Sequence, residues 1–204
     1  MSELYLYGAS GHAKVIIDIA EIVGLQVVGL VDADPKITTL LDYPVDQNFE
    51  NRGKNWVISI GNNKIRKKIA LASIDKIFIK LIHPSSFISK RAKIGEGTVV
   101  MAGVTLNSEA RVGQHCIINT NSSIDHDCVI EDFVHISPNV ALAGDVHIGE
   151  GTHVGIGVCV IQGIKIGKWC TVGAGAVIIK DIPDGATVVG NPGRVIKQDV
   201  ISAI

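Results

Sequence analysis

Aromatic residues are scarce in this chain. Phe, Trp and Tyr make up 4% of its 204 residues, although hydrophobic residues make up 47%. So large an apolar fraction with so few rings indicates a narrow interior that is filled by Ile, Val, Ala, Cys and Thr. A run of about 18 apolar residues is also missing, so the sequence predicts no transmembrane helix and no membrane insertion.

Basic segments, a signal peptide and metal-type cysteine spacings are absent as well. The net charge is −1, and no Lys- or Arg-rich block indicates nucleic acid as a partner. The first residues, MSELYLYGAS, contain no basic segment followed by a long apolar stretch, so we expect a cytoplasmic protein. The four cysteines form no CxxC pair, and we expect neither disulfides nor a metal site from them.

What the chain does have is a branched aliphatic residue at every sixth position from Ile88 to Ile178. Four residues after each comes a second restricted set of small or aliphatic residues, which includes Cys116, Cys128 and Cys170. An α-helix would repeat every 3.6 residues and a flat strand every two, so neither accounts for this period. Period six predicts a left-handed parallel β-helix of hexapeptide repeats, in which both sets point inward.

The first ~80 residues follow another pattern, in which strands alternate with helices. We expect strands at Glu3–Tyr7, Gln26–Val31, Trp56–Ile60 and Lys76–Ile82, a helix that ends near Gly24, and a basic helix that contains Arg66, Lys67 and Lys68. This order indicates a small, mostly parallel Rossmann-like sheet. The predicted domains are therefore residues 1–82, Rossmann-like, and residues 83–204, the β-helix with a C-terminal tail.

A glycine turn, Gly8-Ala-Ser-Gly-His12, separates the first strand from the first helix. Free backbone N–H groups and the helix dipole favour an anion at such a turn. The turn is not GxGxxG, because Ser10 stands at the second glycine position, and no GK[ST] follows it. Two interpretations remain open here: a nucleotide or sugar-phosphate site, and a tight structural turn.

The most polar part of the repeat is NTNSSIDHD, from Asn119 to Asp127. His126 occupies the third position of its hexapeptide, which is a corner or the outside of the coil. A histidine between two carboxylates can act as a neutral base and be stabilised once it is protonated. An exposed turn histidine without a chemical role is the alternative.

Two further histidines, His135 and His153, are one coil of eighteen residues apart and should stack on one face. Stacked imidazoles could bind zinc as in hexapeptide-repeat carbonic anhydrases, but no third ligand has a matching spacing, so no metal is expected. Outward apolar residues, Val99, Ile117, Val129 and Ile161, would be covered if three such prisms packed side by side. We therefore expect a homotrimer with sites at the subunit interfaces.

Four segments, YGASGHAKVIIDIAE, ISIGNNKIRKKIA, NTNSSIDHDCVIEDFVHISP and VVGNPGRVIK, together resemble sugar acetyltransferases of the NeuD/PglD type. This resemblance implies a nucleotide-sugar-binding domain, acetyl-CoA bound between adjacent β-helices of a trimer, and N-acetylation of a 4-amino group on a UDP- or GDP-linked sugar. It also implies that His126 is the general base, that Asp127 raises its basicity, and that Asn119 orients the acceptor or the base.

The same resemblance implies roles for three further groups of residues. His135 would lie near the thioester of acetyl-CoA, and the channel for its pantetheine arm would be lined by Gly144, Ile156, Gly157 and Ala174. Lys180 and Arg194 would meet the CoA phosphates. The sugar nucleotide would contact Ser10, Gly11, His12, Asp32, Gly61 and Asn62. Relatives often show two adjacent acids where this chain has Asp32-Ala33-Asp34, so the nucleobase, uracil or guanine, stays open.

Two other functions fit the same residues. The base could deprotonate a hydroxyl instead of an amine, as in an O-acetyltransferase that acts on sialic acid or a related sugar. A catalytically silent scaffold that only binds the sugar nucleotide is the alternative from another class.

Overall fold

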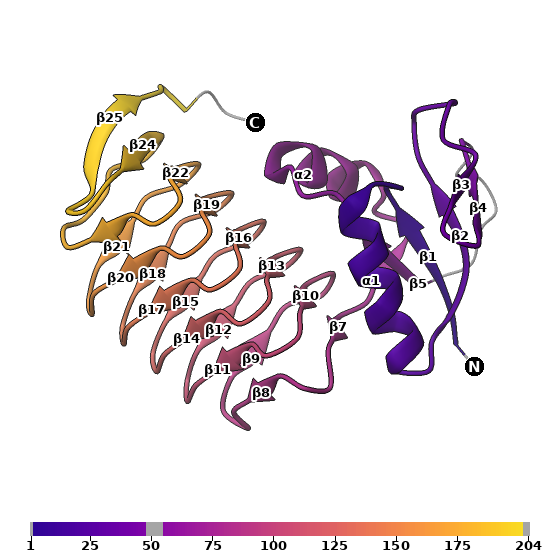
Figure 1. Ribbon diagram of the computed structural model, residues 1–204, viewed down its shortest axis with the longest axis horizontal. Helices are drawn as coiled ribbons and strands as arrows, with labels where there is room; N and C mark the ends of the chain where they lie inside the picture. Colours follow the sequence, from indigo (N-terminus) through magenta and orange to yellow (C-terminus); the bar gives the residue numbers. More distant parts are fainter. Residues whose placement is uncertain (1, 48–54, 202–204) are drawn as a thin grey trace.

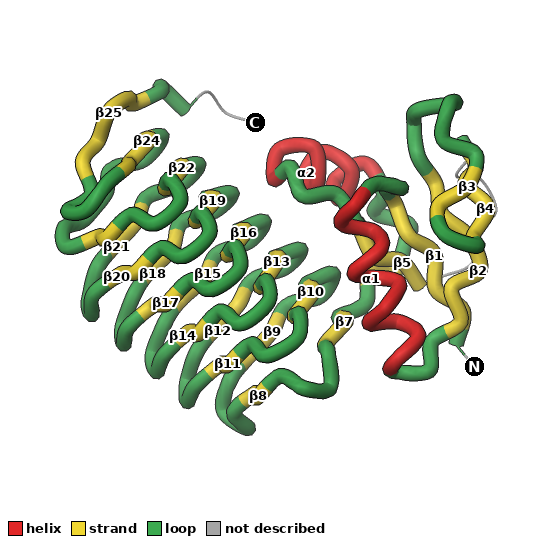
Figure 2. The backbone as a smooth tube through the Cα atoms, viewed as in Figure 1, coloured by secondary structure: helices red, strands yellow, loops and turns green. Residues whose placement is uncertain are grey.

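The computed structural model describes residues 2–47 and 55–201. A small α/β unit is followed by a stack of triangular coils that ends in an antiparallel hairpin (Figure 1). Figure 2 shows that the strands of the coils are short and that turns join them at each corner. Within these described residues, no helix is long and apolar enough to cross a membrane.

The N-terminal sheet has the strand order β3-β4-β2-β1-β5-β6. Its elements are β1 (Glu3–Tyr7), α1 (Gly11–Ile22), β2 (Gln26–Val31), β3 (Thr39–Leu40), β4 (Tyr43–Asp46), β5 (Asn55–Ile58), α2 (Asn63–Ala72) and β6 (Ile77–Phe78). Strand β1 pairs in parallel with both β2 and β5, which confirms the predicted Rossmann-like sheet. The carboxyl ends of β1 and β5 therefore meet at one edge, where ligands bind in open α/β sheets.

Helix α1 forms because its apolar residues recur at helical spacing. Ala13, Ile16, Ile17 and Ala20 are fully buried. The helix ends at Ile22, and Gly24 adopts the left-handed conformation with φ 76°, which glycine reaches without steric cost. The predicted helix and its glycine stop are confirmed.

The hairpin β3–β4 was not expected from the sequence. Its strands pair antiparallel, Thr39 with Pro44 and Leu40 with Tyr43, and Leu41 in the turn has φ 51°. Strands of two and four residues without a glycine in the turn carry too little pattern to be found in advance.

The coils form three faces. Face 1 contains β7 (Leu81–Ile82), β10 (Val99–Val100), β13 (Ile117–Ile118), β16 (His135–Ile136), β19 (His153–Val154), β22 (Thr171–Val172), β24 (Ala186–Val189) and β25 (Arg194–Gln198). Face 2 contains β8 (Phe87–Ile88), β11 (Thr105–Leu106), β14 (Ser123–Ile124), β17 (Ala141–Leu142), β20 (Cys159–Val160) and β23 (Val177–Ile178). Face 3 contains β9 (Lys93–Ile94), β12 (Arg111–Val112), β15 (Val129–Ile130), β18 (His147–Ile148) and β21 (Lys165–Ile166).

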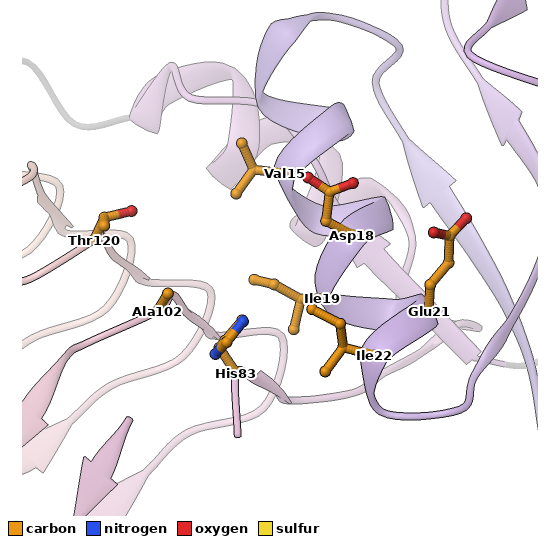
Figure 3. Close-up of a pocket in the computed structure, with 8 residues that line it drawn as sticks. All are labelled: Val15, Asp18, Ile19, Glu21, Ile22, His83, Ala102 and Thr120. Carbon is orange, nitrogen blue, oxygen red and sulfur yellow. The ribbon is translucent and has the colours of Figure 1, made fainter. Parts of the chain in front are cut away.

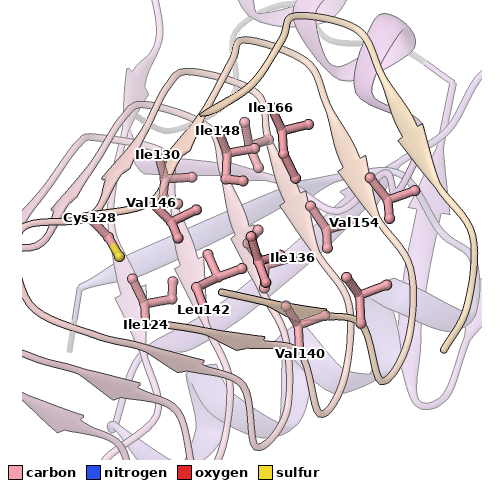
Figure 4. Packing of buried hydrophobic residues seen from close by; sticks show 14 of the residues in the cluster. Ile124, Cys128, Ile130, Ile136, Val140, Leu142, Val146, Ile148, Val154 and Ile166 are labelled. Atoms are coloured by element: carbon pink, nitrogen blue, oxygen red, sulfur yellow. The ribbon is translucent and has the colours of Figure 1, made fainter. Parts of the chain in front are cut away.

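Stacking follows the predicted eighteen-residue register. Ile118 pairs with Ile136, for example, and Ile124 with Leu142. The aliphatic side chains of the repeat fill the interior between the three faces (Figure 4). Cys116, Cys128 and Cys170 are buried among them, as their positions in the repeat predicted, whereas Cys159 is exposed.

The start of the solenoid differs from the expectation. The predicted single strand Lys76–Ile82 is divided: β6 completes the N-terminal sheet, whereas β7 pairs with β10 on face 1. The division arises because Leu81 and Ile82 lie eighteen residues before Val99 and Val100 and so continue the coil register.

Val99 and Ile117 correct a second expectation. Both point outward from face 1 as predicted, but each is only 1% exposed within the single chain. They pack in one cluster with α1 residues such as Ile16 and Ile19, and α1 lies between the N-terminal sheet and the first coils (Figure 1). The N-terminal unit, not a neighbouring prism, covers this part of face 1.

Candidate active site

His126 lies at the corner between β14 on face 2 and β15 on face 3. Its Nδ1 is 2.7 Å from Oδ2 of Asp127, and its backbone N–H donates to Oδ1 of Asp125 over 2.7 Å. Asn107, one coil below, donates to the same Asp125 oxygen. The corner conformation requires φ 61° at Asp127, which Asp tolerates better than most residues. The two carboxylates thus hold the histidine in place from both sides.

This arrangement prepares His126 to accept a proton. The hydrogen bond to Asp127 is the main reason that the pKa of His126 is raised above its ordinary value, and the charge of Asp125 adds to the effect. Because Nδ1 bonds Asp127, the neutral ring presents Nε2 as its free base. The side chain is 59% exposed, so Nε2 is accessible to a substrate.

Gly144 lies directly against this ring. A Cβ atom at position 144 would be 2.5 Å from Cε1 of His126, a separation that only a glycine avoids. The family resemblance places Gly144 along the pantetheine channel. The structure shows a more immediate reason for the glycine, which is that it makes room for the imidazole.

A second group of polar side chains gathers where face 1 meets the N-terminal unit. His135 on β16 stacks on His153 of β19 with ring centroids 4.7 Å apart, as the spacing predicted. Asn119 lies 3.4 Å from Nε2 of His135 through its Nδ2. Burial, followed by the charges of His153, Arg66 and His12, lowers the pKa of His135 to about 3, and a backbone hydrogen bond with Gly61 opposes this shift. His135 is therefore neutral at pH 7.

His12 belongs to the same group. Its Nε2 is buried and has no hydrogen-bond partner among the described residues. Burial, with the nearby charge of Arg66, lowers its pKa to about 4. A buried polar atom without a partner is costly unless a ligand or water satisfies it, so Nε2 marks a place where a polar group binds.

The glycine turn lies at the start of α1. Ser10 is the N-cap residue, but its side chain makes no capping hydrogen bond, and both Ser10 and Gly11 are exposed. Asp32 holds the turn from β2, because its Oδ2 accepts from the amide of Ala9 over 2.8 Å. Gly61 and Asn62 are exposed in the neighbouring turn after β5, where the Asn62 side chain caps α2. The two turns thus form one edge with free polar groups.

The other residues predicted to line the pantetheine channel lie on a different corner of the coils from Gly144. Ile156 and Ala174 are eighteen residues apart, and both are exposed at the corner between faces 1 and 2. Thr120, the neighbour of Asn119, lies two coils before Ile156 on the same corner. Gly157 has φ 67°, and no atom lies within 4 Å of where its Cβ would be. His126, Asp127 and Gly144 lie along the opposite edge of face 2. Within one chain the predicted site residues therefore form two separate groups.

A groove of about 400 Å³ extends from Thr120 along α1 (Figure 3). Val15, Asp18 and Ile22 line it on the helix side, and Ala102 and His83 on the coil side. The groove lies on the edge of face 2 that carries Asn119, and no residue of it was predicted as part of a site.

Arg66 is the residue of this region that sequence reasoning missed. It was expected only as part of a basic helix, yet it is 1% exposed and contacts both the Gly61 turn and the coils. Neighbouring Lys67 and Lys68 share its charge, so the sequence contains no signal that singles it out.

Similarity to known proteins agrees with this architecture. A family model described as the PglD N-terminal domain matches residues 3–72. PerB from Caulobacter crescentus, solved with CoA and GDP-perosamine, is 35% identical, with a TM-score of 0.90 over 97% of this chain and 98% of that chain. The chain belongs to the PglD-type family of sugar acetyltransferases. Its fold class and its assignment to this family are thereby confirmed.

Two further members of the family support the assignment. The acetyltransferase domain of PglB from Neisseria gonorrhoeae, solved with acetyl coenzyme A, is 36% identical and has a TM-score of 0.88, over 95% of this chain and 98% of that chain. UDP-N-acetylbacillosamine N-acetyltransferase from Bacillus subtilis is 40% identical over 124 residues. That match spans about half of each protein, 50% of this chain and 52% of the relative.

Proposed function

We propose that this protein is an acetyl-CoA-dependent N-acetyltransferase that modifies the amino group of a nucleotide-linked amino sugar. The observation that carries the proposal is the exposed His126, whose Nδ1 is bonded to Asp127 while Nε2 is free. PerB binds CoA and GDP-perosamine, and the Bacillus relative acts on a UDP-linked sugar, so the family supports a nucleotide-sugar acceptor with UDP or GDP.

The reaction needs one base and no covalent intermediate on the enzyme. The 4-amino nitrogen attacks the thioester carbonyl of acetyl-CoA, and Nε2 of His126 takes a proton from that nitrogen. The negative charge of Asp127 stabilises the imidazolium that results. When the tetrahedral intermediate collapses, the C–S bond breaks and the CoA thiolate leaves and takes up the proton that the His126 imidazolium gives back, which regenerates the base. Cys116, Cys128 and Cys170 are buried, so an acyl-cysteine route has no accessible nucleophile among them.

Acetyl-CoA fits the corner between faces 1 and 2. Ile156, Gly157 and Ala174 are exposed or half-exposed there, and the open space at Gly157 lets a ligand approach the backbone closely. Thr120 and Asn119 lie on the same corner two coils nearer the N-terminal unit, and Asn119 is next to His135. A pantetheine arm along this edge would end beside His135, in agreement with the role that the family resemblance implies.

Face 2 supports a trimer. Its outward side chains are all uncharged: Phe87, Thr105, Ser123, Ala141, Cys159 and Val177. Face 3 instead presents Lys93, Arg111, Val129, His147 and Lys165. Three copies whose second faces surround a common axis would bring the His126 edge of one copy to the Asn119 edge of the next. The two groups of site residues would then complete each other across the interface.

The sugar nucleotide fits the edge formed by the turns after β1 and β5. Ser10 and Gly11 offer free polar groups at the start of α1, where a diphosphate is favoured. His12 would meet the diphosphate or the sugar through its unpartnered Nε2. Asp32, which already holds the Ala9 amide, lies on the β2 side, where the nucleobase would be.

A thiol-release assay with acetyl-CoA and a panel of UDP-, GDP- and dTDP-linked amino sugars tests this function. We expect turnover with an amino sugar, and loss of most of that turnover, about 10²- to 10⁴-fold, in His126→Ala, with acetyl-CoA affinity nearly unchanged. Equal loss of rate and of acetyl-CoA binding would contradict the base assignment. Turnover only with sugar hydroxyls would indicate an O-acetyltransferase, and binding without any thiol release would indicate a scaffold.

A further inference from the structure

Arg66 carries a guanidinium that is buried between the two parts of the protein. The residue is 1% exposed, and five hydrogen bonds surround the group. Nε donates to the carbonyl of His115 over 2.7 Å, Nη1 to the carbonyls of Ile60 and Gly61 over 2.9 and 3.2 Å, and Nη2 to Oδ1 of Asn63 and the carbonyl of Phe133, each over 2.8 Å. None of these acceptors is a carboxylate.

The acceptors belong to three separate segments of the chain. Ile60 and Gly61 form the turn after β5, which is one half of the edge where the sugar nucleotide fits. His115 and Phe133 are corner residues of two successive coils, and each lies two residues before a strand of face 1, β13 and β16 respectively. The planar fork of an arginine can bond several acceptors in fixed directions at once. Arg66 therefore joins the Gly61 turn to the coil that bears His135.

Burial of a guanidinium without a counter-ion is costly, and the five hydrogen bonds of Arg66 offset that cost only while all of its acceptors stay in place. The positive charge of Arg66 also contributes to the lowered pKa of four nearby histidines, His12, His115, His135 and His153. A residue kept at that cost, between a binding turn and the coils, points to a role beyond packing.

We propose that Arg66 is a positioning residue for the sugar nucleotide, because its guanidinium holds the Gly61 turn at a set distance from His135. The proposal rests on the function proposed above. When the guanidinium is lost, the turn moves relative to the coils, and binding of the sugar nucleotide weakens. Acetyl-CoA, which fits the corner between faces 1 and 2, does not contact this turn.

Arg66→Lys is the first test, since it retains the charge but replaces the fork with a single ammonium. We expect the KM for the sugar nucleotide to rise about tenfold, because at least one of the five hydrogen bonds is lost. The KM for acetyl-CoA and kcat should change less than about twofold. A packing defect alone would affect both substrates.

Lys67→Met is the matched control. Lys67 is the next residue of α2 and also bridges the two parts of the protein, through Glu150, but it does not contact the Gly61 turn. Its sugar-nucleotide KM should stay within about twofold of the wild type. An equal rise in Lys67→Met and Arg66→Lys would overturn the proposal, as would an unchanged sugar-nucleotide KM in Arg66→Lys.

Asn63→Ala covers the case in which Arg66→Lys does not fold. It removes the one side-chain acceptor of the guanidinium and leaves the four carbonyl acceptors, and it also removes the hydrogen bonds that Asn63 Nδ2 donates to the carbonyls of Gly151 and Thr152. We expect the KM for the sugar nucleotide to rise about threefold and the KM for acetyl-CoA to stay the same. An unchanged KM for the sugar nucleotide would overturn the proposal. Wild-type protein without turnover on any amino sugar would instead refute the proposed function. Calorimetric titration of wild type, Arg66→Lys and Asn63→Ala with UDP and GDP then tests Arg66 by itself: weaker binding in the variants supports its role, and equal binding refutes it.

Discussion

At the scale of single residues, the chemistry depends on how two neighbouring side chains are held. Asp127 occupies a left-handed corner position, and from there its carboxylate reaches back to Nδ1 of His126. Gly144 of the next coil leaves the space that the ring occupies. The corner geometry and the next coil thus hold the proposed base in place, and both follow from the repeat.

Replacement of Asp127 by Asn should shift the pH dependence of the reaction. Asn tolerates φ 61°, but it replaces the hydrogen bond to a carboxylate, which is the main cause of the raised pKa of His126, with a bond to a neutral amide, and it also removes the charge of Asp127. Since the neutral ring is the active form, the acid limb of the kcat profile should move to lower pH, and kcat should fall about tenfold because the base is weaker.

Asp145→Asn is the control for this experiment. Asp145 stacks eighteen residues after Asp127 in the same left-handed conformation, but its charge is the smallest contributor to the raised pKa of His126. The acid limb of the kcat profile of Asp145→Asn should stay near that of the wild type. An Asp127→Asn profile with an unmoved acid limb would show that His126 is not the group that titrates.

At the scale of elements, the corners that precede face 1 join the two parts of the protein. His115 stacks on Phe133 with ring centroids 5.4 Å apart and meets Phe78 edge-on at 4.7 Å. Its Nδ1 is buried without a partner among the described residues. Burial and the charge of Arg66 lower its pKa to about 4, which makes this contact sensitive to pH.

Stability should fall as the pH drops from about 6.5 toward 4. In this window an unfolded chain protonates His115 near the ordinary histidine pKa of 6.5, whereas the folded chain does not. The contribution of His115 to the free energy of unfolding is complete above pH 6.5. As the pH falls, it is lost at up to about 1.4 kcal/mol per pH unit for each histidine with a pKa lowered in this way. Urea unfolding midpoints at several pH values measure the slope.

His115→Asn should flatten this pH dependence, because Asn tolerates φ 51° and does not titrate. His126→Asn is the control: the pKa of His126 is raised, so its loss should not flatten the slope. If the slope of His115→Asn equals that of the wild type, His115 is not one of the groups responsible.

At the scale of the whole molecule, the three faces have different partners. The N-terminal unit covers the lower part of face 1, and face 3 is rich in basic residues. Face 2 has an uncharged outer surface from Phe87 to Val177, on which Phe87, Ser123 and Cys159 are exposed, and its two edges carry the two groups of predicted site residues. In the proposed trimer, these two groups complete one site across the interface between copies of the chain.

Cys159 reports on that assembly, because it is an exposed thiol on face 2. In the proposed trimer it faces the common axis, so thiol reagents should react slowly with the native protein, and all four cysteines should react after denaturation. Rapid reaction of one thiol in the native protein would contradict the interface.

Cys159→Arg should dissociate the trimer, since an unpaired charge at a buried interface costs several kcal/mol. Sedimentation velocity would then show monomers, and turnover would be lost with the assembly. Lys165→Glu on face 3 is the control and should leave the trimer intact. A trimeric Cys159→Arg protein would assign the interface to another face.

The sequence predicted the fold well where its pattern was periodic. The sixfold repeat specified the solenoid, the buried cysteines and the stack of His135 on His153, and the spacing of Ile16 and Ile19 specified α1. The hairpin β3–β4 and the division of Lys76–Ile82 were missed, because segments of two residues carry no periodicity of their own. The prediction that neighbouring copies cover Val99 and Ile117 was wrong, because the repeat shows that a residue faces outward but not what covers it.

By itself, the sequence determined the coil, its register and the corner that holds His126, because each follows from local spacing that every coil repeats. Only the tertiary structure decided which face the N-terminal unit covers, that Arg66 is buried with five acceptors, and that the site residues divide between two edges of face 2. These features depend on contacts between segments far apart in the chain, such as Arg66 with Phe133, 67 residues later. Such contacts form through packing and hydrogen bonding in three dimensions, and they leave no period in the chain.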